Sequence, residues 1–262
     1  MWAASVNLHF VGLKPLDITW GIGLRSSTVD SLPMSGSTHA FEAGRAFRDG
    51  WKGFNRNAGT LVGFTVLAAV VLGLLQALQF GLIASAANNP ESLGGISVLL
   101  FGIALLQAII GLVISIALLD GGLQSVRGRN LAFGDLFAKV TEVPNLIGLQ
   151  LFGGLAVLLG FLAFVVPGVY LAVAYVFAGM ALVDRPQSFM DALNSSRRLV
   201  TPHWFDVTLF LLAILGVVLL GYLACLVGGF VSVPVGFCMV AAGYQQLLSL
   251  SGKAAPSEES QS

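Results

Sequence analysis

The residues in this sequence that could do chemistry are three aspartates at the ends of long uncharged segments. Asp120 and Asp184 each end such a segment, and Asp206 lies at the start of another. One interpretation is that these carboxylates form salt bridges near a membrane surface. The other interpretation is a polar site for a cationic or zwitterionic ligand. The arginines that could pair with them are Arg127, Arg185, Arg197 and Arg198.

We expect these groups to gather on one face of the protein in a candidate polar cluster. Its members are Asp120, Asp184, Ser196, Arg197, Arg198 and Asp206. Exchanging the charges of Asp184 and Arg198 would test whether this particular pair forms. No ionisable residue lies in the middle of a predicted membrane span. This counts against a proton-driven pump, because charges inside the bilayer usually mark such paths.

Other catalytic chemistry has no support in the sequence. His9, His39 and His203 are scattered and have no metal-ligand spacing. The chain has no Ser-His-Asp constellation, phosphate-binding loop or His-Glu-x-x-His motif. Cys225 and Cys238 are expected to be small packing residues, with a disulfide as the alternative. We therefore expect a protein that is not an enzyme and that needs no metal or cofactor.

The segment from residue 40 to 57 has the period of an amphipathic helix. Phe47, Trp51 and Phe54 fall on one side, and four cations fall on the other. This basic face consists of Arg45, Arg48, Lys52 and Arg56, at spacings of 3, 4 and 4. An aromatic face opposite a basic face is typical of a helix in the membrane interface. The alternative is a surface helix that packs on protein. The expected partners are membrane lipids, including anionic head groups.

The composition is that of an integral membrane protein. The chain is 56% hydrophobic and 10% charged, and its mean hydropathy is +0.87. A soluble domain carries about 25% charged residues. The net charge is zero, so we expect no nucleic-acid partner.

The sequence predicts an all-α chain with six transmembrane helices in three hairpins, each preceded by an amphipathic interfacial helix. Residues 38–250 form this membrane domain. The predicted spans are 60–86, 96–119, 146–166, 169–183, 207–227 and 235–250. The fourth run is short for a bilayer about 30 Å thick, so a re-entrant hairpin is the alternative there.

The two ends of the chain look different from the membrane domain. Residues 1–37 lack a sustained period, and a polar tail covers 251–262. We expect a poorly structured extension, with Met34 as a candidate true start and a disordered cytoplasmic tail as the alternative. The C-terminal tail, residues 251–262, should be disordered and cytoplasmic.

The basic residues predict the orientation. All 13 lie in the N-terminal region, after the second and fourth runs, or in the C-terminal tail. Under the positive-inside rule both termini are therefore cytoplasmic.

Short patterns recur along the chain and predict three copies of one unit. A Phe-x-Asp triplet precedes each hairpin, beginning at Phe47, Phe133 and Phe189. The second and third amphipathic helices are expected over 133–142, ended by the proline at 144, and over 189–200. A proline also stands at or near each outer turn: Pro90, Pro167 and Pro234.

Part of the sequence resembles a known membrane family. The run 166–173 contains Pro167, Gly168 and Tyr170, and it is followed by Ser-x-Arg-Leu at 196–199 and by His203-Trp204. These residues resemble the membrane domain beside some glycerophosphoryl diester phosphodiesterases and the YciC-like bacterial proteins. The resemblance implies a bacterial inner-membrane protein. The chain lacks the soluble catalytic barrel of the fused relatives, so the resemblance does not extend to their activity.

Two functions are compatible with these features. The first is a non-enzymatic envelope or membrane-organising protein. The alternative is a transporter or lipid-handling protein with a pocket between the helical hairpins. Gln76, Gln79 and Gln107 would line such a path, or would form hydrogen bonds between helices.

Overall fold

The computed structural model describes residues 41–88, 93–224 and 228–252, which belong to one compact unit, His39–Ser262. The predicted extension at 1–37, its candidate start at Met34, the turn at Pro90, Cys225 and most of the C-terminal tail lie outside the described residues. Within the described residues the chain forms helices and no strand. The prediction of an all-α chain is confirmed for this part.

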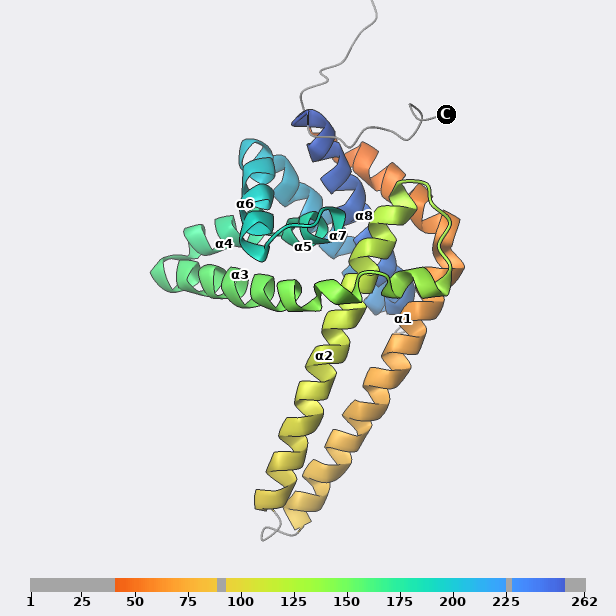
Figure 1. The fold of residues 1–262 in the computed structure, drawn as a ribbon, viewed down its shortest axis with the longest axis vertical. Coiled ribbons are helices and arrows are strands. Elements are labelled where there is room, and N and C mark those ends of the chain that lie inside the picture. The colour runs from red at the N-terminus through yellow and green to blue at the C-terminus, as the bar shows by residue number, and fades with distance from the viewer. Residues whose placement is uncertain (1–40, 89–92, 225–227, 253–262) are drawn as a thin grey trace, which may run out of the picture. The chain divides into compact units, whose positions relative to one another are not determined.

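The elements follow one another with short connections (Figure 1). In chain order they are α1 (Ala43–Asn88), α2 (Leu93–Val126), the 3-10 helices η2 (Phe133–Phe137) and η3 (Val140–Glu142), α3 (Val143–Ala163), α4 (Val165–Ala174), α5 (Ala178–Asp184), α6 (Phe189–Val200), the 3-10 helix η4 (Thr201–His203), α7 (Trp204–Ala224) and α8 (Gly229–Leu250).

Six helical segments in the described part of the chain have the length and apolar composition needed to cross a membrane. Each corresponds to one of the six uncharged runs of the sequence. Many of their large apolar side chains are exposed, including Leu74, Phe101 and Leu162. Such side chains suit a lipid environment. The chain therefore has the character of a multi-pass membrane protein.

Helix α1 combines the predicted amphipathic helix and the first predicted span in one element. Its backbone departs from helical geometry at Asn57, where φ is −121° and ψ is 22°. The aromatic face before this kink packs mainly on protein: Phe54 is buried, and the Phe47 ring lies 5.3 Å from the Phe210 ring of α7. Trp51 is about half exposed, at 49%. Most of this aromatic face therefore packs on protein, while Trp51 stays accessible.

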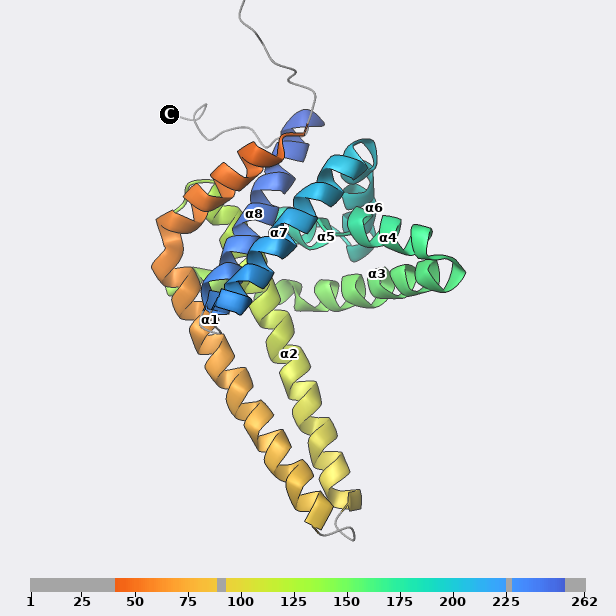
Figure 2. The same cartoon turned by 180° about the vertical axis from the view of Figure 1, so that it is seen from behind.

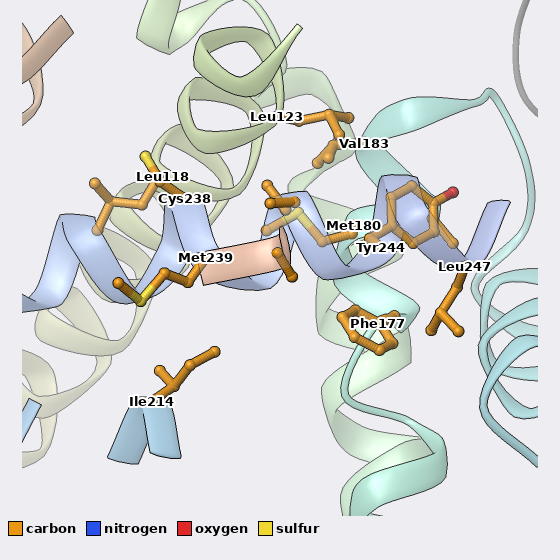
Figure 3. Close-up of a cluster of buried hydrophobic side chains, with 14 of the residues drawn as sticks. Leu118, Leu123, Phe177, Met180, Val183, Ile214, Cys238, Met239, Tyr244 and Leu247 are labelled. Carbon is orange, nitrogen blue, oxygen red and sulfur yellow. The ribbon is translucent and has the colours of Figure 1, made fainter. Parts of the chain in front are cut away.

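Helix α8 lies at the centre of the core. It contacts α1, α2 and α7, and these neighbours lie beside it in Figures 1 and 2. Cys238, Met239, Tyr244 and Leu247 of α8 are buried among side chains from α2, α5 and α7 (Figure 3). The last predicted span is thus the helix on which α1, α2 and α7 pack.

Glycine allows two neighbours to approach the backbone of α8. A Cβ on Gly50 of α1 would lie 2.6 Å from the Met239 Cα, and a Cβ on Gly122 of α2 would lie 3.1 Å from the Phe237 carbonyl oxygen. Small residues at such contacts are common in membrane helices, because close packing stabilises their association.

The third and fourth predicted spans turn at a different residue from the one expected. The chain turns at Phe164, which is extended with φ −164° and ψ 155°, and α4 begins at Val165. Pro167 and Gly168 therefore lie inside α4 and are not the turn. Proline is tolerated in a first helical turn, where its missing N–H would have no partner. Gly168 permits close contact, since its Cα lies 3.0 Å from where a Cβ on Gly160 would be.

Two other prolines also differ from the expectation. Pro234 lies inside α8, which already begins at Gly229, so it does not form the outer turn. Pro144 lies in the first turn of α3 and starts that helix. The amphipathic segment before it forms the 3-10 helices η2 and η3 instead of an α-helix.

The fourth predicted span is a broken helix. α4 ends at Ala174 and α5 begins at Ala178, so three residues separate them. The broken segment Val165–Asp184 still has the length and composition of a membrane span. Inside a bilayer, non-helical backbone is tolerated only where protein or water satisfies its polar groups.

Candidate functional site

Asp184 is the centre of a polar clamp between three helices. Its side chain is only 4% exposed. It accepts hydrogen bonds from the Arg127 guanidinium and from Tyr244 Oη of α8, the latter at 3.1 Å. Arg185 Nε lies 3.8 Å from the same carboxylate. A buried carboxylate needs such partners, because desolvating an unpaired charge is costly.

The local sequence explains how this clamp forms. Asp184 is the last residue of α5, and Arg127 directly follows the end of α2. A cation at a helix C-terminus also interacts favourably with the helix dipole. The clamp therefore fixes the ends of α2 and α5 at one level against α8.

The other five members of the candidate polar cluster have different surroundings. Asp120 is buried and accepts a hydrogen bond from the Gln124 amide one turn later on α2. Ser196 is fully buried, and its Oγ donates to the Ala174 carbonyl at 2.7 Å. Arg197, Arg198 and Asp206 are exposed.

The candidate polar cluster is therefore spread over separate environments. Among the residues that the structure describes, no hydrogen bond or salt bridge joins two of its six members. Asp184 pairs with Arg127 and more distantly with Arg185, two of the four arginines considered, and not with Arg198.

Ser196 satisfies the backbone at the break between α4 and α5. Ala174 is the last residue of α4, so its carbonyl has no ordinary helical partner. The buried Ser196 hydroxyl supplies that partner from α6. This contact makes the interrupted helix compatible with an apolar environment.

A second polar network surrounds the kink of α1. Asn57 is buried, and its Nδ2 donates to Ser125 Oγ at 3.0 Å and to the Arg129 carbonyl at 2.9 Å. Thr60 Oγ1 donates to the Leu131 carbonyl at 3.1 Å. The network attaches the loop after α2 to the kink.

The basic face keeps its four cations on the exposed side of α1. Arg45, Arg48, Lys52 and Arg56 are all exposed. Arg48 and Lys52 line a groove against Met239 of α8, together with Phe47 and Trp51. This groove is bordered by two basic residues and three apolar ones.

The family-marker residues also make packing contacts. Tyr170 Oη lies 3.0 Å from Thr201 Oγ1, and its ring centroid lies 6.3 Å from that of Trp204. With Gly168 against Phe161, these contacts join α4 to α3 and to the start of α7. In the described residues no group of three or more His, Cys, Asp or Glu side chains could hold a metal ion.

Comparison with known proteins finds relatives in mycobacteria. The chain is 28% identical over 229 residues to uncharacterized protein Rv2560 of Mycobacterium tuberculosis strain H37Rv, covering 79% of this chain and 69% of that protein. Uncharacterized protein Mb2590 of Mycobacterium bovis is similar to the same extent, with 28% identity and the same coverage. No family model matches the sequence. No solved structure matches it.

Sequence reasoning missed several residues of these networks, among them Tyr244, Asn57, Ser125 and Thr60. Tyr244 looked like an ordinary residue of the last span, and Asn57 looked like the end of the amphipathic helix. A signal for Asn57 was present, since it is a polar residue between a basic face and an uncharged run. A polar residue at such a boundary can bind backbone groups where a helix changes direction.

Proposed function

We propose that this chain is a non-enzymatic, multi-pass protein that organises the bacterial cytoplasmic membrane. The six apolar helices support the membrane location. The distribution of all 13 basic residues supports cytoplasmic termini. The relatives in Mycobacterium tuberculosis and Mycobacterium bovis are consistent with a bacterial origin.

The observation that carries the proposal is the closed core around α8. Buried apolar residues of α1, α2, α5, α6, α7 and α8 form one continuous cluster. Glycine contacts bring α1 and α2 against the α8 backbone. A transporter with a pocket between hairpins needs a polar space among these helices, so dense packing there favours a scaffold.

The helical contacts also support the finer parts of the proposal. α1 packs on α2, α3 on α4, and α7 on α8, which suits three hairpins. α6 has a buried apolar side and exposed Arg197 and Arg198, which suits an interfacial helix. The proposal also includes membership of the membrane family that resembles the phosphodiesterase-associated domain. Gly168 and Ser196, two of the residues that carry this resemblance, have packing roles here.

Reconstitution tests the role. The full chain is placed in vesicles of phosphatidylglycerol and phosphatidylcholine that contain fluorescent phosphatidylglycerol. We expect anionic lipid to concentrate around the protein, to remain chemically intact by mass spectrometry, and to stay in its original leaflet in a dithionite assay. A variant with Arg45, Arg48, Lys52 and Arg56 all changed to Gln is the control and should lose the enrichment. Lipid hydrolysis or protein-dependent scrambling would refute the proposal.

Cysteine labelling tests the topology. In a background without Cys225 and Cys238, single cysteines replace Phe164, at the turn after α3, and Asn194, on α6. Both positions are exposed. An impermeant maleimide should label Phe164→Cys in intact cells and Asn194→Cys only after permeabilisation. Labelling of both from the outside would contradict the orientation.

A further inference from the structure

A groove of about 370 Å³ lies between the start of α1 and α8. Met239 of α8 forms its buried side, and Phe47 and Trp51 of α1 add apolar walls. The position of this groove follows from the contact of Gly50 with the Met239 backbone, which brings the two helices together. The hydrocarbon stems of Arg48 and Lys52 complete a lining that is almost entirely apolar. Their charged ends therefore lie at the rim of the groove.

The structure separates these two cations from the others on the basic face. Arg45 forms a salt bridge with Glu42 at 3.4 Å. Arg56 extends over Gly128, where its Nη1 lies 2.5 Å from the position of an added Cβ. Arg48 and Lys52 form no salt bridge with any residue that the structure describes. Their spacing of four residues puts both side chains on one side of the helix.

The groove lies beside one end of a membrane span. Lys52 comes five residues before the kink at Asn57, and α1 then carries no charge to its end at Asn88. Lipid head groups lie at the ends of such uncharged segments. Tryptophan is favoured at this level, and long basic side chains can place their charges there while their stems contact apolar surface.

We infer that this groove binds one anionic glycerophospholipid, whose phosphate lies between Arg48 and Lys52 and whose upper acyl chain contacts Phe47, Trp51 and Met239. A guanidinium can donate two parallel hydrogen bonds to phosphate oxygens, and an ammonium adds a second positive charge. The volume is near the lower end of ligand sites, about 300 to 1,000 Å³. It therefore takes a head group and the start of one chain, while the rest of the lipid stays in the bilayer. This inference rests on the proposed membrane-organising role.

Native mass spectrometry of the full chain in a neutral detergent tests the site. Dioleoyl phosphatidylglycerol is titrated, and the population with one bound lipid is measured. We expect the double variant R48Q/K52Q to bind about 30-fold more weakly, from the usual contribution of two basic residues at an anionic surface. The control R197Q/R198Q removes two exposed charges from α6 and should bind like the unchanged protein. Dioleoyl phosphatidylcholine should bind more weakly than phosphatidylglycerol.

Further measurements separate a lipid from a free anion. We expect W51A to weaken phosphatidylglycerol binding, and inorganic phosphate or glycerophosphoglycerol to compete poorly, because neither has acyl chains. Full competition by inorganic phosphate would overturn the lipid assignment. Unchanged affinity in R48Q/K52Q, or an equal loss in R197Q/R198Q, would overturn the site.

The two proposals can fail separately. One outcome is that the variant R48Q/K52Q enriches lipid in vesicles as strongly as the unchanged protein does. That result would refute the lipid site in the groove and leave the organising role intact. Scrambling or hydrolysis would refute the role, whereas the single-lipid binding in detergent would still report on the groove. A thermal unfolding curve of each variant confirms that these exposed substitutions preserve the fold.

Discussion

The Leu131 backbone N–H donates to Asn57 Oδ1 at 2.9 Å, between residues 74 positions apart in the sequence. The same side chain donates to Ser125 and to the Arg129 carbonyl. One amide therefore holds the loop after α2 against the kink of α1. This loop also contains Arg127, so the kink and the clamp at Asp184 belong to connected parts of the fold.

Replacing Asn57 by alanine should destabilise the protein. The Leu131 N–H is attached to a buried residue and would lose its partner, whereas the Arg129 carbonyl belongs to an exposed residue and can reach water. The unsatisfied Leu131 N–H and the lost hydrogen bonds should lower the free energy of unfolding by about 2 kcal/mol. Thermal unfolding in detergent measures the effect. Asn55→Ala, at an exposed position two residues earlier, is the control. Equal midpoints for the two variants would contradict the role of Asn57.

Gly50→Ala should also lower the unfolding midpoint. The new Cβ would lie 2.6 Å from the Met239 Cα, and a backbone atom in a packed helix cannot easily move away. Overpacking of this kind typically costs about 1 to 3 kcal/mol. Gly59→Ala is the matched control on the same helix, because a Cβ there meets nothing within 4 Å. The control should be neutral or slightly stabilising, since alanine favours helix. A neutral Gly50→Ala would show that α1 and α8 are less closely packed.

The six spans could be predicted because their signal is local. A helix that crosses a bilayer needs about 20 apolar residues, and charge is absent from each run. The turn between the third and fourth runs depends on more distant contacts. Pro167-Gly168 is a common turn sequence, yet the chain turns at Phe164. Gly168 is instead needed for close contact with Gly160, which sequence alone does not indicate.

The partners of the polar residues were harder to predict for the same reason. The sequence placed Asp184 near several arginines, but the choice of Arg127 depends on α2 and α5 ending at the same level. Tyr244 became a partner because α8 is central, whereas the sequence suggested only a last span. The hydrogen bond from Ser196 to the Ala174 carbonyl was equally hard to predict, because it requires the break in the helix after Ala174.

A double-mutant cycle should show coupling between Asp184 and Arg127. Asp184→Asn and Arg127→Gln each break the salt bridge, so the two losses in stability should not add. Arg127 is 34% exposed while Asp184 is 4% exposed, so removing the arginine should be the more damaging change. We expect a coupling energy of about 1 kcal/mol from unfolding in detergent.

The matched cycle combines Asp184→Asn with Arg198→Gln. Arg198 is exposed and makes no salt bridge with Asp184, so these two effects should add. Additivity in the Arg127 cycle together with coupling in the Arg198 cycle would show that the partner is Arg198.

Ser196→Ala should destabilise the region around the broken helix. The substitution removes the donor to the Ala174 carbonyl, and Ser196 and Ala174 are both fully buried. An unsatisfied buried carbonyl costs about 1 to 3 kcal/mol. The effect should be local, because α4, α5 and α6 meet there. Hydrogen–deuterium exchange of the peptides covering 171–180 should therefore increase in Ser196→Ala.

The neighbouring serine provides the control for this last change. Ser195→Ala removes a hydroxyl from the same helix at a partly exposed position. It should leave exchange at 171–180 unchanged, since α6 keeps its bond to Ala174. Faster exchange in both variants would point to a general weakening of α6. Faster exchange in Ser196→Ala alone would assign the effect to the hydroxyl, because helix propensity changes equally in the two substitutions.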